Sequence, residues 1–177
     1  VYKRQPVSEC ISFLHTLASH MHRLAMQGLS DTTKSSTPTD FALMNHVVHM
    51  ILQVAPTAGV LAFVPPLLAL AQETSAPVVS NAALVHHTLT CRWFVGAVFA
   101  QISNVWQQQS ILDYLHVHHE PTLRDMAPTA PDLSDSYDPS PLEIPHFGSG
   151  LYSEAPAYAW DTPFLIEALS SNLALQK

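Results

Sequence analysis

Eleven histidines are the side chains of this sequence best suited to chemistry, because clustered imidazoles can hold a metal ion. Eight of them gather in three stretches, "HTLASHMH" (His15, His20 and His22), "NHVVH" (His46 and His49, one helical turn apart) and "HVHH" (His116, His118 and His119). A metal site needs a complete ligand set at defined spacings. No HExxH motif occurs, and no acidic ligand joins any of these stretches at a metal spacing. We therefore predict no metal ligands and interpret the histidines as surface or half-buried side chains.

Nucleophilic catalysis finds equally little support in the sequence. Cys91 precedes Arg92, whose charge would lower the pKa of the thiol, but a lone cysteine in an apolar run is typical of a small buried side chain. Ser149 lies between two glycines in "FGSGL", without the strand-to-helix context of a nucleophile elbow. The five glycines are too widely spread for a phosphate-binding loop. We predict no catalytic residues, no cofactor and no enzymatic activity.

The composition indicates a folded chain with few charges. Apolar residues make up 47% of the 177 residues and charged residues only 12%, against a usual charged share of roughly 25%. The net charge of −7 argues against direct nucleic-acid contact by this segment. Cys10 and Cys91 match neither a spaced metal pair nor a disulfide framework, which favours an intracellular protein with reduced thiols. No apolar segment typical of a signal peptide follows Lys3 and Arg4.

Two helices that could position these side chains are expected in the first third of the chain. Apolar residues recur at helical spacing over residues 8–27, and Gly28 is suited to end that helix. The loop "SDTTKSSTPT" follows, with turn-forming residues throughout. A second helix begins at a Thr39 or Asp40 cap and closes at Pro56.

Prolines divide the middle of the chain. In "GVLAFVPPLLALAQ", Pro65–Pro66 remove amide donors and predict two short helices or one sharp kink. A further helix is expected to begin with Ser75 as its cap and Pro77 in its first turn. No proline then occurs before Pro121, which predicts one long helix or two helices with a break near Cys91.

Two charge-free stretches, residues 41–72 and 93–112, raise the question of a membrane. Each reaches the about 20 residues that span the hydrocarbon layer. Amides such as Gln101 and Asn104 would be costly in lipid, and flanking basic residues are nearly absent. We favour helices buried in a protein core and keep a membrane segment as the alternative.

Residues 120–177 are rich in proline and acidic side chains and predict little regular structure. The exception is "WDTPFLIEAL", where Thr162 can cap a helix and Pro163 fits its first turn. Its apolar side chains need a surface to cover them, either the chain's own helices or a protein partner. The residues that we predict to bind such a partner are Trp160, Phe164, Leu165 and Leu169.

These patterns predict an all-α fold, an irregular bundle of about five helices with an acidic, proline-rich and mostly irregular C-terminal tail. Residues 6–119 form the expected helical domain, and residues 120–177 form the tail, with a short helix near 162–175. Residues 1–5, "VYKRQ", resemble translated sequencing-adapter DNA, and we expect them to be an artefact.

The run "LVHHTLTCRWFVGAVFAQISNVWQQQSILDYL" resembles the late helix of the regulatory region in fungal zinc-cluster transcription factors. The matching positions are Leu89, Ile102, Trp106, Ile111 and Leu115. The stretch "ECISFLHTLASHMHRL" is similar to the preceding helix of that region, and the resemblance covers about residues 8–119. The acidic tail with Trp160 and Phe164 looks like an activation segment.

The resemblance implies a helical regulatory module of a fungal transcription regulator, nuclear in location, that holds or releases an activation tail. A protein partner is expected at the tail or the helical surface. The six-cysteine DNA-binding cluster of that family is absent from this sequence. Two other classes remain open. One is a helical scaffold fragment of a large eukaryotic assembly protein. The other is a histidine-rich membrane oxidoreductase, whose histidine boxes "HVHH" resembles.

Overall fold

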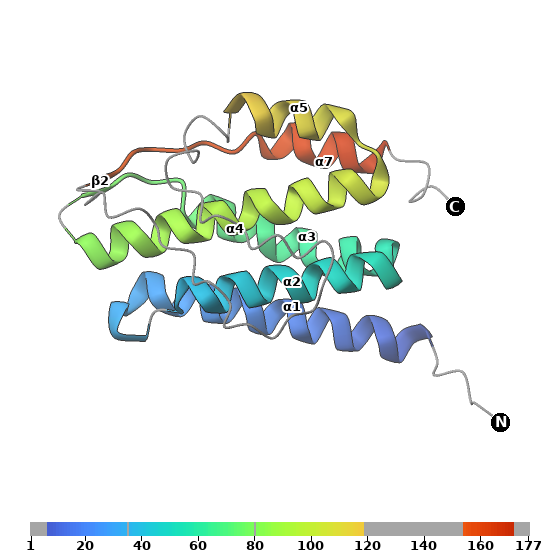
Figure 1. Cartoon of the computed structure of the whole chain (residues 1–177), viewed down its shortest axis with the longest axis horizontal. Helices are drawn as coiled ribbons and strands as arrows, with labels where there is room; N and C mark the ends of the chain where they lie inside the picture. The colour runs from blue at the N-terminus through green and yellow to red at the C-terminus, as the bar shows by residue number, and fades with distance from the viewer. Residues whose placement is uncertain (1–6, 35, 80, 119–153, 172–177) are drawn as a thin grey trace, which may run out of the picture.

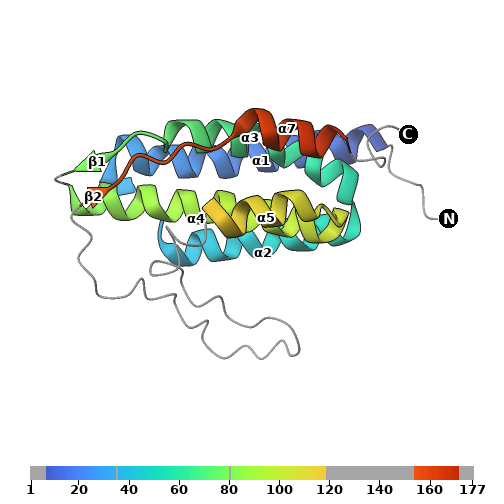
Figure 2. The same cartoon turned by 90° about the horizontal axis from the view of Figure 1, so that it is seen from above.

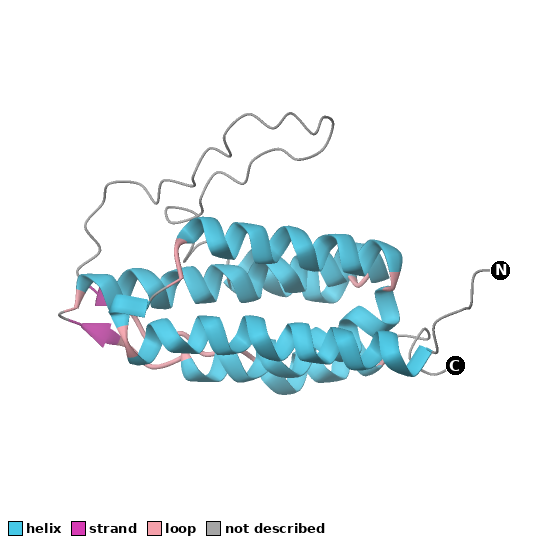
Figure 3. Cartoon of the chain, turned by 90° about the horizontal axis from the view of Figure 1, so that it is seen from below, coloured by secondary structure: helices cyan, strands magenta, loops and turns pink. Residues whose placement is uncertain are grey.

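The computed structural model describes residues 7–34, 36–79, 81–118 and 154–171, which form the predicted all-α bundle (Figure 1). Within this part of the chain lie α1 (Val7–Ser30), α2 (Pro38–Val54), α3 (Pro56–Glu73), α4 (Ala82–Trp106), α5 (Gln109–His118) and α7 (Thr162–Ser170). A short 3-10 helix, Thr32–Lys34, and two strands, β1 (Val78–Val79) and β2 (Glu154–Ala155), complete it (Figure 3). The adapter-like residues 1–5 and the tail residues 120–153 lie outside the described residues.

Helix α4 is the centre of the bundle. It packs against α1, α2, α3 and α5, and the two strands also contact it. Figure 1 shows α5 and α7 on the side of α4 opposite to α2, and Figure 2 shows the helices running along one common axis. Within the described residues, no helix combines the length and the apolar character needed to cross a membrane.

The first two helix boundaries differ from the sequence prediction. Helix α1 continues through Gly28 to Ser30, so the predicted end at Gly28 was wrong. A Cβ at position 28 would overlap the imidazole ring of His87, so the glycine allows α1 and α4 to pack closely. Helix α2 is capped by Thr37, whose side chain accepts a hydrogen bond from the Asp40 amide, while the Asp40 carboxylate accepts one from the Thr37 amide. The predicted cap at Thr39 or Asp40 was wrong, since this reciprocal capping box satisfies two free amides at once.

Helix α3 does not break at its prolines. It runs through Pro65 and Pro66 to Glu73 and buries Val60, Phe63 and Leu67, among other side chains. A proline inside a helix costs about 3 kcal/mol. Because α3 packs against α1, α2 and α4, burial of its apolar side chains offsets this cost. Of the two predicted alternatives, the division into two short helices was wrong.

The bounds of α4 also differ from the sequence prediction. The predicted start at Ser75 and Pro77 was wrong, because residues 75–79 lead into strand β1, and Asn81 caps α4 through a bond from the Leu84 amide. Helix α4 is continuous through Cys91, so the alternative break there was wrong as well. The chain breaks instead at Gln107, which adopts a left-handed backbone conformation with φ of 54°.

The near absence of charged residues in α4 follows from its central position in the bundle. Val95, Val98 and Ile102 are fully buried and recur at helical spacing. Burial nevertheless extends around most of the helix and includes Arg92 and His87. A central helix packed on several sides has little solvated surface to carry charges.

Candidate functional site

Residues 154–171, the docked segment, lie along the bundle (Figure 2). Strand β2 pairs with β1 in antiparallel register, with Ala155 opposite Val78. Beyond the strand, the amide of Tyr158 donates a hydrogen bond of 2.9 Å to the carbonyl of Ser75. The first part of the segment is therefore held as an extended chain through its backbone.

Arg92 of α4 also holds this stretch. Its guanidinium donates from Nε to the carbonyl of Thr74 at 2.8 Å, from Nη2 to that of Ala76 at 3.0 Å and from Nη1 to that of Pro156 at 2.7 Å. The side chain is only 1% exposed. One cation thus joins the end of α3, the approach to β1 and the docked segment.

The electrostatics explain how this buried charge is tolerated. Burial lowers the pKa of Arg92, and the nearby Tyr158 opposes that shift. Arginine titrates so high that the side chain remains charged. In the described part of the chain its partners are carbonyl dipoles and the Tyr158 ring, whose centroid lies 5.8 Å from Cζ. Thr74 caps the C-terminus of α3, where the helix dipole also favours a cation.

Aromatic side chains continue the contact along the segment. Tyr158 and Trp160 are each 9% exposed, and their ring centroids lie 5.1 Å apart in an edge-on arrangement. Trp160 also lies 6.3 Å from the ring of Phe99 on α4. The Tyr158 hydroxyl donates to the carbonyl of His118, and burial raises the pKa of this phenol, which keeps it protonated as a donor.

Helix α7 completes the docking. Its cap is Asp161, whose carboxylate accepts a hydrogen bond from the Phe164 amide, so the predicted cap at Thr162 was wrong by one residue. The Asp161 amide donates to the hydroxyl of Tyr114 on α5 at 2.9 Å. The ring of Phe164 lies 5.2 Å from that of Tyr114. This helix is therefore fixed at its first turn by α5.

The four residues predicted to bind a partner all lie on the chain's own bundle. Leu165 is fully buried, Leu169 and Trp160 are 4% and 9% exposed, and Phe164 is half-buried. Of the two surfaces that could cover the short helix, the chain's own helices or a protein partner, the structure shows the chain's own helices. The side chains of the segment join the same buried core as those of the bundle. Binding of a protein partner stays a prediction.

The histidines are dispersed over the helices. His15, His20, His116 and His118 are exposed, His22, His46 and His49 are half-buried, and His119 lies outside the described residues. Among the residues that the structure describes, no three His, Cys, Asp or Glu side chains lie together as a metal site requires.

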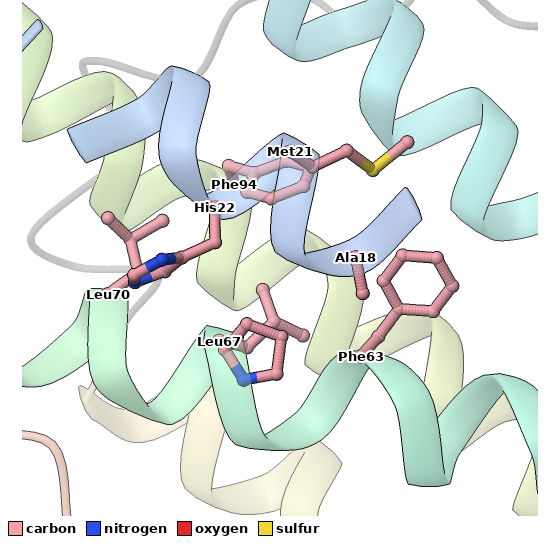
Figure 4. Close-up of a pocket in the computed structure, with 8 residues that line it drawn as sticks. Ala18, Met21, His22, Phe63, Leu67, Leu70 and Phe94 are labelled. Atoms are coloured by element: carbon pink, nitrogen blue, oxygen red, sulfur yellow. The ribbon is translucent and has the colours of Figure 1, made fainter. Parts of the chain in front are cut away.

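A small cavity lies between α1, α3 and α4 (Figure 4). Its volume of about 10 Å³ is that of a single water molecule. Ligand pockets measure roughly 300 Å³ or more, so this cavity cannot hold an organic ligand. Its lining is mainly apolar and consists of Ala18, Met21, His22, Phe63, Pro66, Leu67, Leu70 and Phe94.

Two other buried groups serve the fold. His87 approaches the carbonyl of Ala25 on α1 with Nε2 at 2.8 Å, and burial lowers its pKa. Cys91 is fully buried, and burial raises the pKa of its thiol more than the Arg92 charge lowers it. The interpretation of Cys91 as a buried small side chain is confirmed, and a reactive thiolate at this position is disfavoured.

Sequence reasoning missed Arg92, Tyr158 and Tyr114 as the residues that organise this site. The sequence did contain one signal for the role of Arg92, which is the only Asp, Glu, Lys or Arg residue between Glu73 and Asp113. A charge in such an apolar run must be paired or hydrogen-bonded if the helix is buried.

No family model, curated protein or solved structure matches this chain. The resemblance to the regulatory region of fungal zinc-cluster transcription factors therefore stays a prediction. What the site can do follows from its own geometry, which holds an acidic, aromatic segment by backbone and side-chain contacts.

Proposed function

We propose that this chain is a regulatory interaction module, which holds its own C-terminal segment on a helical bundle and releases it to a protein partner. The observation that carries the proposal is the bond from buried Arg92 to the carbonyl of Pro156, beside the bonds to Thr74 and Ala76. A buried cation that donates to backbone carbonyls fixes the place of the segment through its main chain, and the same guanidinium faces the Tyr158 ring.

The docking has the energetic character of a reversible contact. The strand pair has two residues on each side, and α7 has nine residues. A helix of that length is marginal alone in water. Short elements with few backbone bonds open locally at a lower free energy than the whole domain unfolds. Release of residues 154–171 can therefore occur while α1–α5 stay folded.

A released segment presents a surface suited to a basic, apolar partner. Trp160, Phe164 and Leu165 would become available as apolar anchors of the kind that dominate interfaces. The neighbouring Asp161 and Glu167 would raise the rate of encounter with a positive partner but add little affinity. We propose that this partner belongs to the transcription machinery and that the chain acts in the nucleus, as the resemblance to zinc-cluster regulators implies.

The proposal is tested by fusing residues 150–177 to a heterologous DNA-binding domain and measuring reporter output in yeast. We expect activation that is lost with Phe164→Ala, because an aromatic anchor contributes a few kcal/mol when buried. Asp161→Asn is the matched control, since asparagine also caps helices and an exposed charge contributes well under about 1 kcal/mol. A fusion that never activates would remove the transcriptional part of the proposal.

A further inference from the structure

The bundle recognises the extended part of the docked segment, "EAPAYAW", through its main chain. Val78 and Val79 pair with it as a strand, the Ser75 carbonyl accepts from the Tyr158 amide, and Arg92 donates to the Pro156 carbonyl. Binding an extended peptide by adding it to a strand is a recurring mode of peptide recognition, in which backbone bonds give affinity and alternate side chains give specificity. We call the surface formed by residues 74–79 and the facing side of α4 the peptide groove.

Side-chain burial along this stretch defines what the peptide groove accepts. Ala155, Tyr158 and Trp160 are buried, whereas Pro156 and Ala157 are exposed. Ala155 is fully buried in a small cluster, so the groove has room for a methyl group at that position. That cluster consists of Val85, Leu89 and Ala155, with Val78 and Trp93 against it.

The aromatic positions are selected by different contacts. Tyr158 is recognised through its hydroxyl, which donates to the His118 carbonyl, and through its ring, which faces the Arg92 guanidinium. Trp160 is recognised through the packing of its ring against the rings of Phe99 and Tyr158. The recognised pattern is a small residue, any two residues, tyrosine, any residue and tryptophan, because Pro156 is exposed and is bonded only through its carbonyl.

We propose that the peptide groove also binds this pattern in trans, as an extended peptide of a partner protein, and that such a peptide releases the docked segment by taking its place. The inference rests on the proposed function in one respect, because both need residues 154–171 to leave the bundle. It adds the class of partner that triggers release.

Competition with the chain's own segment sets the affinity that can be observed. A segment tethered to its site has an effective concentration of about millimolar, so a free peptide with the same contacts must approach about that concentration to displace it. Weakening the tethered copy removes this competitor and leaves the groove unchanged. The test therefore compares the full chain with a full-chain variant in which Trp160 of the docked segment is replaced.

The experiment uses a fluorescein-labelled synthetic peptide of residues 152–171, titrated into the full chain and followed by fluorescence anisotropy. We expect the peptide to bind Trp160→Ala at least about tenfold more tightly than the unaltered chain, because truncating a buried aromatic weakens its docking by at least that factor. Arg92→Met, added to Trp160→Ala, should weaken peptide binding by about tenfold or more. Arg23→Met is the matched control and should change nothing, because Arg23 is exposed on α1.

Two altered peptides test the pattern itself. Ala155→Leu in the peptide should abolish binding, because that side chain enters a fully buried position. Ala157→Leu, two residues later at an exposed position, should bind like the unaltered peptide. Equal binding of these two peptides, or no gain from Trp160→Ala in the chain, would overturn the inference.

Circular dichroism establishes whether Trp160→Ala is folded. If this variant does not fold, a second measurement, made on the unaltered chain, tests whether the peptide displaces the docked segment. In the isotope-labelled unaltered chain, millimolar unlabelled peptide should accelerate hydrogen exchange of the Tyr158 amide, which is bonded to Ser75 in the docked state. An unchanged exchange rate would refute displacement. A reporter fusion that activates while no peptide binds would leave the proposed function standing and remove this inference alone.

Discussion

Replacing Arg92 by methionine tests the contact that holds the docked segment. Methionine has a similar length and is apolar, so it fills the site without donating hydrogen bonds. The three carbonyls of Thr74, Ala76 and Pro156 then lose their donor. Thr74 is 1% exposed, whereas Ala76 and Pro156 are exposed residues whose carbonyls can bind water instead.

The magnitude follows from that difference in exposure. Losing a charged donor at a buried carbonyl costs about 1.5–3 kcal/mol, and each bond that water can replace costs about 0.5–1 kcal/mol. Loss of the guanidinium–Tyr158 contact adds about 1 kcal/mol. The desolvation cost of the buried cation is relieved at the same time, which offsets about 1–3 kcal/mol. These contributions leave a net loss centred on about 3 kcal/mol, a large part of the about 5–15 kcal/mol that stabilises a domain.

The assay is equilibrium urea denaturation followed by circular dichroism, together with hydrogen exchange of the Tyr158 amide. Arg23→Met is the control, because Arg23 is an exposed residue bonded to His20 one turn away, and it should lie within about 0.5 kcal/mol of the unaltered chain. Exchange of the Tyr158 amide should accelerate in Arg92→Met and stay unchanged in the control. An Arg92→Met chain as stable as the control, with the Tyr158 amide still protected, would refute this account of the docking.

Three further outcomes are expected. Gly28→Ala should destabilise the chain by about 1–3 kcal/mol in urea denaturation, because the added methyl group overlaps the His87 ring. Leu165→Ala should cost about 2–5 kcal/mol by the same measurement, and Ile166→Ala, at a half-exposed neighbour, should cost clearly less. Burial lowers the pKa of His87 below its ordinary 6.5, so the unfolded chain takes up protons first. Stability should therefore be full above pH 6.5 and fall as the pH drops below it, and His87→Gln should reduce this dependence. An unfolding free energy equal at about pH 7.5 and about pH 5.5 in the unaltered chain would contradict this sign.

Helical periodicity was sufficient to predict the fold class, because apolar side chains three and four residues apart identify helices that pack together. The boundaries failed where a distant residue decides them. Gly28 has the local character of a helix end, but the His87 ring opposite requires a glycine inside the helix. Pro65 and Pro66 are local helix breakers, and burial of α3 among its neighbours outweighs them.

Less of the site than of the fold could be predicted from the sequence. The apolar residues of the docked segment were identified from their spacing, and so was the possibility that they cover the chain's own bundle. The role of Arg92 could not be predicted, because its acceptors lie 18, 16 and 64 positions away in the sequence. Backbone carbonyls carry no signature in the sequence, so only the folded arrangement reveals such a partner.

The central claim is that the bundle sequesters the segment that acts on a partner. It is tested most directly by reporter output from three fusions to the same DNA-binding domain, each normalised to its abundance. They carry residues 150–177 alone, the full chain, and the full chain with Arg92→Met. We predict strong output from the isolated segment, weak output from the full chain, and a rise towards the isolated segment with Arg92→Met but not with Arg23→Met. Equal output from the isolated segment and the full chain would contradict the claim, as would an Arg92→Met chain no more active than the full chain.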